Sequence, residues 1–277
     1  MTALPQRSLN DGGTIPAWGM GTYGHQGPAG VELFAQAARD GHRLFDTAAQ
    51  YGNEATVGVG LAESGVSREE LFVTTKIAGG DQGRGSTRRG LEESLRRLDM
   101  DYVDLVLIHW PNPSRGLYVD TWLDLVEARE EGLARHIGVS NFLPAHIDDL
   151  YEASGIYPTV NQIQLHPMIQ RRDVRSYLDE HDIVAEAWRP IGFKEHLLDQ
   201  IVVENIAEEV GCTPAQVVLK WAVNHGIVPI AVSSKPERNR ENLALAEVKL
   251  TDTHMHALDS LDAGQRFVWD PLTHEEW

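Results

Sequence analysis

Four side chains that could together carry out proton transfer follow one another near the ends of short apolar runs. They are Asp46, Tyr51, Lys76 and His109. A tyrosine phenol has a pKa of about 10, but a neighbouring ammonium group lowers that pKa because it stabilises the phenolate. Lys76 supplies such a charge if its strand lies beside the strand of Asp46, whose carboxylate would then fix the lysine. His109 could donate a hydrogen bond to the same substrate oxygen.

Together these groups suit proton donation to a carbonyl oxygen while hydride arrives at the carbonyl carbon. No side chain supplies hydride, so this chemistry requires a cofactor. The sequence therefore predicts a redox cofactor beside the four residues, provided that the fold brings them together.

The segments between these residues predict a fold that does so. Eight short apolar runs rich in β-branched residues alternate with longer segments of helical period, and the runs cover residues 18–22, 43–47, 71–76, 103–110, 136–141, 159–164, 183–188 and 226–232. Eight alternating units in 277 residues predict a closed, parallel (β/α)8 TIM barrel, which is an α/β fold. Residues 10–13 predict the turn of a short N-terminal β-hairpin that caps the barrel bottom. No linker divides the chain, so we expect one domain over residues 1–277.

Further polar and aromatic residues lie where such a barrel carries its active site, at the C-terminal ends of the strands. The fifth run ends with Ser140 and Asn141. Gln162 lies in the latter half of the sixth run, and Trp188 ends the seventh. Any one of them could be a residue at the barrel rim that solvent wets. Six consecutive strands that each offer a suitable group favour one shared pocket.

The stretch GMGTYG at residues 19–24 raises an alternative architecture. It matches G-x-G-x-x-G, the loop of a dinucleotide-binding βαβ unit. That alternative predicts a two-domain Rossmann dehydrogenase with an open sheet. In a Rossmann loop the third glycine lies at the start of the helix. Here the helical signal begins only at Pro28, four residues after Gly24. We therefore favour a barrel strand followed by a loop.

Composition limits the partners. The formal net charge of −17 disfavours nucleic acid and anionic lipid, and no segment approaches the roughly 18 apolar residues of a membrane helix. The single cysteine, Cys212, excludes an internal disulfide and a Cys-based zinc site. The histidines of HMH at residues 254–256 would point to different faces of a helix, so no metal is expected. We expect a cytoplasmic monomer that binds a small-molecule carbonyl substrate.

Several motifs, in order, resemble the signatures of the aldo-keto reductase family. They are FDTAAQYGNE, TTK, LVLIHWP, IGVSNF, VNQIQLHP and RNRENL, and the resemblance runs from about residue 7 to about residue 263. Within the family the chain looks most similar to bacterial 2,5-diketo-D-gluconic acid reductases. The resemblance implies a (β/α)8 barrel, NADPH as cofactor, and reduction of aldehydes or ketones, including keto-sugar acids or α-dicarbonyls, to alcohols.

The resemblance also implies roles for individual residues. Tyr51 would be the general acid, supported by Lys76, Asp46 and His109. The nicotinamide carboxamide would be held by Ser140, Asn141 and Gln162, and its ring would stack on Trp188. Other contacts to the cofactor would come from Thr22, Pro190, Ile191, Gly192, Ser233, Arg238, Glu241 and Asn242. The substrate pocket would be lined by Tyr23, Ala78 and Trp110.

One departure from the family pattern concerns the cofactor. Val232 stands where family members commonly have a lysine that helps to hold the 2′-phosphate. Arg238 remains, and an arginine can stack on adenine and pair with phosphate. We expect NADPH to be preferred by a reduced margin, with NADH as a possible cofactor.

Other departures concern the pocket. Ala78 stands where an aromatic residue often closes it, and Arg189 replaces a residue that is commonly small, so we expect a wider or differently charged pocket. The segment 79–85 is expected to be flexible and the tail 268–277 to lie on the surface. A non-catalytic barrel that senses bound nucleotide and docks a partner is the alternative function. Loss of a catalytic residue would favour that alternative. All four predicted catalytic residues are present, so we favour the enzyme.

Overall fold

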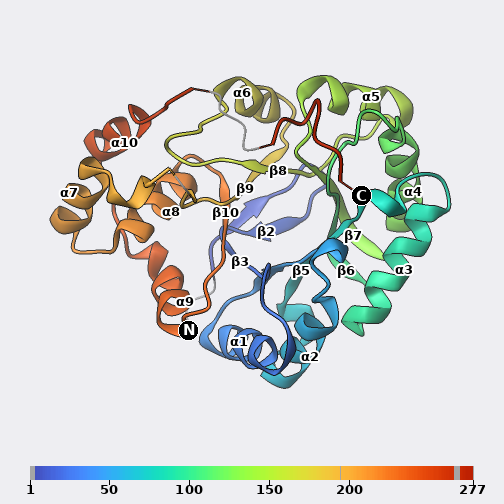
Figure 1. Ribbon diagram of the computed structural model, residues 1–277, viewed down its shortest axis with the longest axis horizontal. Helices are drawn as coiled ribbons and strands as arrows, with labels where there is room; N and C mark the ends of the chain where they lie inside the picture. The colour runs from blue at the N-terminus through green and yellow to red at the C-terminus, as the bar shows by residue number, and fades with distance from the viewer. Residues whose placement is uncertain (1–3, 194, 265–268, 277) are drawn as a thin grey trace.

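The computed structural model describes residues 4–193, 195–264 and 269–276, and its centre is a closed barrel of parallel strands (Figure 1). Around the barrel the strands follow the order β10-β3-β4-β5-β6-β7-β8-β9. Their bounds are β3 Gly19–Gly21, β4 Leu44–Asp46, β5 Phe72–Ile77, β6 Val103–Ile108, β7 Ala134–Ser140, β8 Val160–Gln164, β9 Val184–Trp188 and β10 Val228–Ala231. Each of the eight predicted runs overlaps one of these strands, which confirms the (β/α)8 barrel.

Helices surround the barrel on the outside, as Figure 1 shows. Eight of them each come after one barrel strand in the chain: α1 Gly27–Asp40, α2 Glu54–Ser64, α3 Ser86–Leu98, α4 Tyr118–Glu130, α5 Pro144–Ser154, α6 Arg172–Glu180, α8 Pro214–Asn224 and α9 Pro236–Leu243. Two further helices, α7 Ile201–Val210 and α10 Asp252–Asp259, contact each other.

The pattern of α3 explains why these segments become helices on the barrel surface. Leu91, Leu95 and Leu98 are spaced three or four residues apart and are buried. Glu93 and Arg96 lie on the solvent side, where their side chains pair at 2.6 Å. Residues three and four apart share one face of a helix, so burial of the leucine face fixes α3 against the strands.

The interior of the barrel is apolar at one end only. Inward side chains of six strands form a cluster: Leu44, Phe72, Leu105, Leu107, Val160, Val184, Val228 and Ile230. Leu9 and Ile15 join this cluster from the N-terminal hairpin, whose strands are β1 Gln6–Ser8 and β2 Thr14–Pro16. The hairpin therefore closes the amino-terminal end of the barrel, as predicted. Polar inward side chains gather at the opposite end, where the strands finish.

The first two glycines of GMGTYG, Gly19 and Gly21, allow close packing of neighbouring side chains in the barrel. A Cβ atom on Gly19 would lie 2.5 Å from Cγ of Leu44, and one on Gly21 would lie 2.5 Å from Cγ2 of Val232. Both glycines belong to β3, which pairs with β4 and β10 in the closed sheet. The Rossmann alternative is therefore wrong, because the sheet is a closed barrel and the motif begins within one of its strands.

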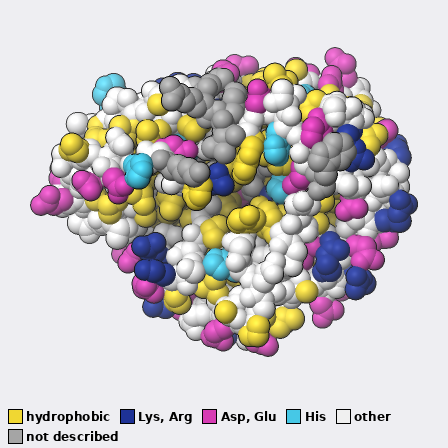
Figure 2. Space-filling view, in the orientation of Figure 1, with side chains coloured by type: hydrophobic (Ala, Val, Ile, Leu, Met, Phe, Trp, Pro, Cys, Tyr) yellow, Lys and Arg dark blue, Asp and Glu magenta, His cyan; other side chains and the backbone are white. Residues whose placement is uncertain are grey.

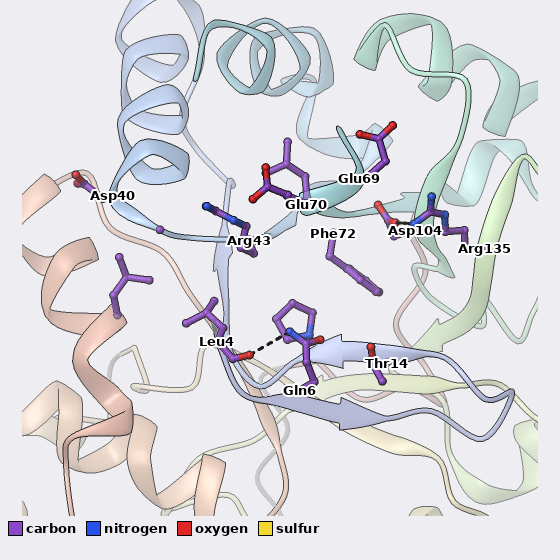
Figure 3. Close-up of a pocket in the computed structure, with 14 residues that line it drawn as sticks. Leu4, Gln6, Thr14, Asp40, Arg43, Glu69, Glu70, Phe72, Asp104 and Arg135 are labelled. Carbon is purple, nitrogen blue, oxygen red and sulfur yellow. Dashed lines mark hydrogen bonds and ion pairs between the residues drawn. The ribbon is translucent and has the colours of Figure 1, made fainter. Parts of the chain in front are cut away.

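A hollow of about 620 Å³ lies at the hairpin end of the molecule (Figure 3). Its walls include Gln6 and Thr14 of the hairpin together with charged side chains from the starts of β6 and β7. Two of these charges, Arg135 and Asp104, pair at 3.2 Å. None of the predicted catalytic residues lines this hollow.

Candidate active site

A second pocket, of about 450 Å³, opens where the strands end. In Figure 2 a hollow near the middle of this face is bordered by hydrophobic side chains and histidines. Ten predicted site residues line the pocket: Thr22, Tyr23, Asp46, Tyr51, His109, Trp110, Ser140, Asn141, Gln162 and Trp188. The strand ends thus bring together side chains that are spread over more than half of the sequence.

Lys76 lies beneath the pocket and is fully buried. Its Nζ atom is 2.6 Å from Oδ1 of Asp46 and donates to the carbonyl oxygen of Thr47 at 3.0 Å. Because β4 and β5 are neighbours, the two charged side chains meet inside the barrel. The same Nζ atom is 5.1 Å from the ring centroid of Tyr51. The ammonium group therefore contacts both a carboxylate and the phenol ring.

Tyr51 is presented to the pocket by the short turn Ala49–Tyr51 that follows β4. Its ring is half-buried, and its centroid is 5.8 Å from that of His109, the residue after β6. The exposed ring of Tyr23 packs edge-on against Tyr51 at 5.1 Å. A phenol, an ammonium group and an imidazole thus converge on one pocket, which is the arrangement that the sequence predicted.

The pKa of Tyr51 differs from the sequence expectation. Burial raises the pKa of the phenol above its usual value and outweighs the nearby Lys76 ammonium, which lowers it. The expected lowering of the phenol pKa is therefore wrong. The main physical reason is burial, which disfavours the charged phenolate, and the negative charge of Asp46 adds to it. Asp46 and Tyr51 in turn raise the pKa of Lys76, which keeps it charged.

A hydrogen-bonded chain connects the ends of β7, β8 and β9. The Ser140 hydroxyl donates to the carbonyl oxygen of Gln162 at 2.9 Å. The Asn141 amide donates to the Ser140 hydroxyl, and its Oδ1 accepts from Nε1 of Trp188 at 2.8 Å. Asn141 adopts a φ of 64°, which few non-glycine residues do. The chain holds the half-buried Trp188 ring in the wall of the pocket.

Comparison with known proteins identifies this arrangement. A model of the aldo/keto reductase family matches residues 18–263. An aldo-keto reductase of Mycolicibacterium vanbaalenii is 48% identical over 273 residues, which cover 98% of this chain and 97% of that protein. This chain belongs to the aldo/keto reductase family. It is therefore an NAD(P)H-dependent oxidoreductase.

Two further similarities refine the comparison. The 2,5-diketo-D-gluconic acid reductase B of a Corynebacterium species is 42% identical over 276 residues, with 100% of both chains covered. A crystal structure of a Gox0644 variant in complex with NADPH has a TM-score of 0.94 and 40% identity, over 98% of this chain and 99% of that one. The sequence expectation of a family member similar to diketogluconate reductases is confirmed.

The C-terminal tail of this aldo/keto reductase lies at the surface, where Leu272 and Thr273 are exposed as expected. The sequence did not indicate that the tail also enters the site, where Trp269, His274 and Glu276 line the pocket. Trp269 packs on Trp188 with ring centroids 5.8 Å apart, and His274 packs on Trp110 at 4.2 Å. Oε1 of Glu276 lies 2.7 Å from Nδ1 of His109. In Figure 1 the tail is the red segment that ends at the C label. These contacts make the tail one wall of the pocket.

The segment after β5 is fixed rather than loose, in contrast to the expectation for residues 79–85. Gln82 is buried and donates to the carbonyl oxygen of Trp110 at 2.6 Å. The backbone N–H of Gly79 donates to Oε2 of Glu276 at 3.2 Å. Ala78 is buried beside this segment and lies outside the pocket lining. The close approach of the tail is at Gly79, where a Cβ atom would lie 1.9 Å from the carbonyl oxygen of Glu276.

Two groups of predicted cofactor residues lie outside the pocket. The first, Pro190–Gly192, follows β9 in a tight turn in which the Gly192 N–H donates to the Arg189 carbonyl at 2.9 Å. The second comprises Ser233, which precedes α9, and Arg238, Glu241 and Asn242 on that helix. Arg238 and Glu241 are exposed. Both segments follow the C-terminal ends of neighbouring strands, β9 and β10, and so adjoin the pocket.

Within the described ranges, no group of three or more His, Cys, Asp or Glu side chains is placed to hold a metal ion. The HMH segment lies on α10, where Nε2 of His254 is 3.3 Å from Oε1 of Glu209. Over the same ranges, no helix is both long and apolar enough to cross a membrane.

Glu186 is a buried acidic residue that the sequence reasoning missed. It lies in β9, is fully buried, and accepts a hydrogen bond of 2.6 Å from the amide nitrogen of Gln162. The same nitrogen donates to Asp46 at 2.8 Å. Burial, with the negative charge of Asp46, raises the pKa of Glu186 to about 8. The sequence could have indicated Glu186, because alternate residues of a strand point to the same face of the sheet. Residues 184, 186 and 188 therefore share the face that carries Trp188.

We expect Glu186→Gln to change how stability depends on pH. The folded protein keeps a proton on Glu186 up to a pKa of about 8, whereas the unfolded chain releases it near the usual pKa of about 4.3. The free energy of unfolding of the wild type therefore falls as pH rises through this window. Between pH 5 and 9 it should fall by on the order of 2–4 kcal/mol more than that of the variant.

Urea unfolding at several pH values measures this difference. Glu247→Gln is the matched control, because it removes an exposed carboxylate. If wild type and Glu186→Gln follow parallel curves from pH 5 to 9, Glu186 does not hold the extra proton.

Proposed function

We propose that this aldo/keto reductase uses NADPH to reduce an aldehyde or ketone to an alcohol, with Tyr51 as the proton donor. The convergence of the Tyr51 phenol, the Lys76 ammonium group and the His109 imidazole on one pocket carries the proposal. The NADPH complex of the Gox0644 variant, a neighbour at 40% identity, supports the choice of cofactor.

The pocket fits the nicotinamide end of a dinucleotide. The amide nitrogen of Gln162 is committed to two carboxyl groups, so its amide oxygen is the atom left to accept from a carboxamide NH₂. The half-buried face of Trp188 offers a stacking surface beside it. When bound, the cofactor supplies hydride to the carbonyl carbon. Ser140, Asn141 and Gln162 would hold the carboxamide, and Thr22 would lie along the same wall.

The rest of the dinucleotide would follow the ends of β9 and β10. Pro190, Ile191 and Gly192 would lie along the diphosphate. Ser233, Arg238, Glu241 and Asn242 would contact the adenosine end. The exposed position of Arg238 on α9 suits contact with a phosphate or an adenine ring.

The protein's own groups account for the proton. Tyr51 donates its hydroxyl proton to the carbonyl oxygen, and Lys76 stabilises the phenolate that remains. His109 orients the same oxygen. The raised pKa of Tyr51 keeps the phenol protonated at neutral pH, so the proton donor is present before substrate arrives. Asp46 holds Lys76 in place through the 2.6 Å ion pair.

The substrate class is tested with a panel of purified compounds. The 42% identity to a 2,5-diketo-D-gluconic acid reductase B supports keto-sugar acids or α-dicarbonyls as candidates. The experiment follows NADPH consumption with aldehydes, α-diketones and keto-sugars. Turnover of at least one class is expected, and failure with every class would contradict the proposed function.

Val232 leads to a prediction about the cofactor. Its side chain is 42% exposed and lines the pocket, so a longer side chain there can extend into solvent. We expect kcat/KM to favour NADPH over NADH by less than about a thousandfold, or about 4 kcal/mol. Val232→Lys should raise that preference about tenfold, because an ammonium group can pair with the 2′-phosphate.

Val232→Met is the matched control, since it adds length without charge. The measurement is the ratio of kcat/KM for the two cofactors in all three proteins. A wild-type ratio above a thousandfold, or equal ratios in the lysine and methionine variants, would count against a role for position 232.

A further inference from the structure

Arg189 is a cation at the mouth of the pocket that the proposed chemistry does not use. It directly follows β9 and lines the same pocket as Tyr51 and His109. Its φ is 50°, a left-handed conformation that is uncommon outside glycine. Such conformations cluster at binding and catalytic sites, where the surrounding structure holds them.

Three aromatic rings surround the guanidinium group. Its central carbon lies 4.6 Å from the ring centroid of Phe193, 5.0 Å from that of Trp269 and 5.6 Å from that of Trp188. The rings come from β9, the turn after it and the C-terminal tail. Cation–π contacts of this kind fix the position of an arginine while leaving its N–H groups to donate elsewhere.

Arg189 also differs in its charged partners from arginines on α3 and in the turn before it. Arg84, Arg88 and Arg97 each pair with one or more carboxylates at 2.5–3.0 Å. Among the residues that the structure describes, no carboxylate forms an ion pair with Arg189. Aromatic rings, rather than a carboxylate, therefore hold the guanidinium group of Arg189 in place.

The charges of the pocket are arranged on opposite sides. Lys76 and Asp46 pair with each other, and Glu276 lies against His109 and the end of β5. Arg189 follows β9, which lies across the barrel from β5 in the closed strand order. A ligand in the pocket therefore meets a carboxylate on the β5 side and a guanidinium group on the β9 side.

We propose that Arg189 is an anion-binding residue of this pocket, which donates paired hydrogen bonds to the oxygens of a carboxylate or phosphate group. A guanidinium group presents its N–H donors in a planar fork that matches two such oxygens. The proposal rests on the proposed function and narrows it. The anionic oxygens come either from a carboxylate carried by the carbonyl substrate or from the diphosphate of the bound dinucleotide.

The experiment compares Arg189→Gln with the wild type on acid and ester pairs that differ only in charge. Suitable pairs are 4-oxobutanoate with its methyl ester, and 4-carboxybenzaldehyde with its methyl ester. If the substrate supplies the anion, the ratio of kcat/KM for acid over ester falls about tenfold or more in Arg189→Gln. If the cofactor supplies it, that ratio stays constant and the Kd of NADPH, measured by fluorescence titration without substrate, rises about tenfold.

Two further variants serve as controls. Arg189→Lys keeps the charge and should retain part of the effect that Arg189→Gln removes. Arg96→Gln removes an exposed charge from α3, outside the pocket lining, and reports any effect of net charge alone.

An unchanged acid-to-ester ratio together with an unchanged NADPH Kd in Arg189→Gln overturns the proposal. The same result in Arg96→Gln as in Arg189→Gln also overturns it. Failure of the proposed function itself looks different, because the wild type would then reduce neither acids nor esters.

Discussion

Tyr51→Phe is expected to lower kcat for carbonyl reduction by about 10²–10⁴-fold while the Kd of NADPH stays nearly constant. The substitution removes only the hydroxyl group that would protonate the carbonyl oxygen. The phenyl ring keeps its packing against Tyr23 and His109, at 5.1 and 5.8 Å between ring centroids. Steady-state kinetics give kcat, and fluorescence titration in the absence of substrate gives the Kd of NADPH.

The matched control for this prediction is Tyr151→Phe. Tyr151 is 43% exposed on α5 and stacks on Tyr157, away from the pocket lining. Its loss of a hydroxyl group should leave kcat within experimental error. A Tyr51→Phe enzyme that keeps more than about a tenth of wild-type kcat would show that another group protonates the substrate.

Much of the site follows from the sequence because a barrel gathers strand ends at one face. Once the eight runs are recognised, Asp46, Lys76 and His109 must lie near one another, whatever their separation in the chain. The apolar hairpin residues Leu9 and Ile15 close the other end, so the polar pocket has only one possible position. Regular alternation of strands and helices therefore carries most of the information about the fold.

Other parts of the site carry no such signal. The tail is irregular, and the contacts of Glu276 with Gly79 and His109 span more than 160 residues. No periodic pattern encodes them. The sequence also does not predict whether the pKa of Tyr51 is raised or lowered, because burial raises it and the Lys76 ammonium group lowers it. Glu186 was accessible in principle, since it shares the inward face of β9 with Trp188.

Lys76→Met is expected both to destabilise the protein and to reduce its activity, for two separable reasons. The substitution leaves Asp46 buried without its partner at 2.6 Å. Breaking a buried ion pair on one side costs about 3–5 kcal/mol of the free energy of unfolding, because the remaining charge is uncompensated. It also removes the cation that would stabilise the Tyr51 phenolate, so kcat should fall by about 10²-fold or more.

The double variant Lys76→Met/Asp46→Asn separates the two effects. With the carboxylate neutralised, no unpaired charge remains beside Gln162 and Glu186, so urea unfolding should recover about 2 kcal/mol or more relative to the single variant. Recovery of stability cannot restore the missing cation, and kcat should stay as low as in Lys76→Met. A double variant that regains both stability and turnover would mean that Lys76 only holds the barrel interior together. If it regains stability alone, the ammonium group acts on the phenol itself.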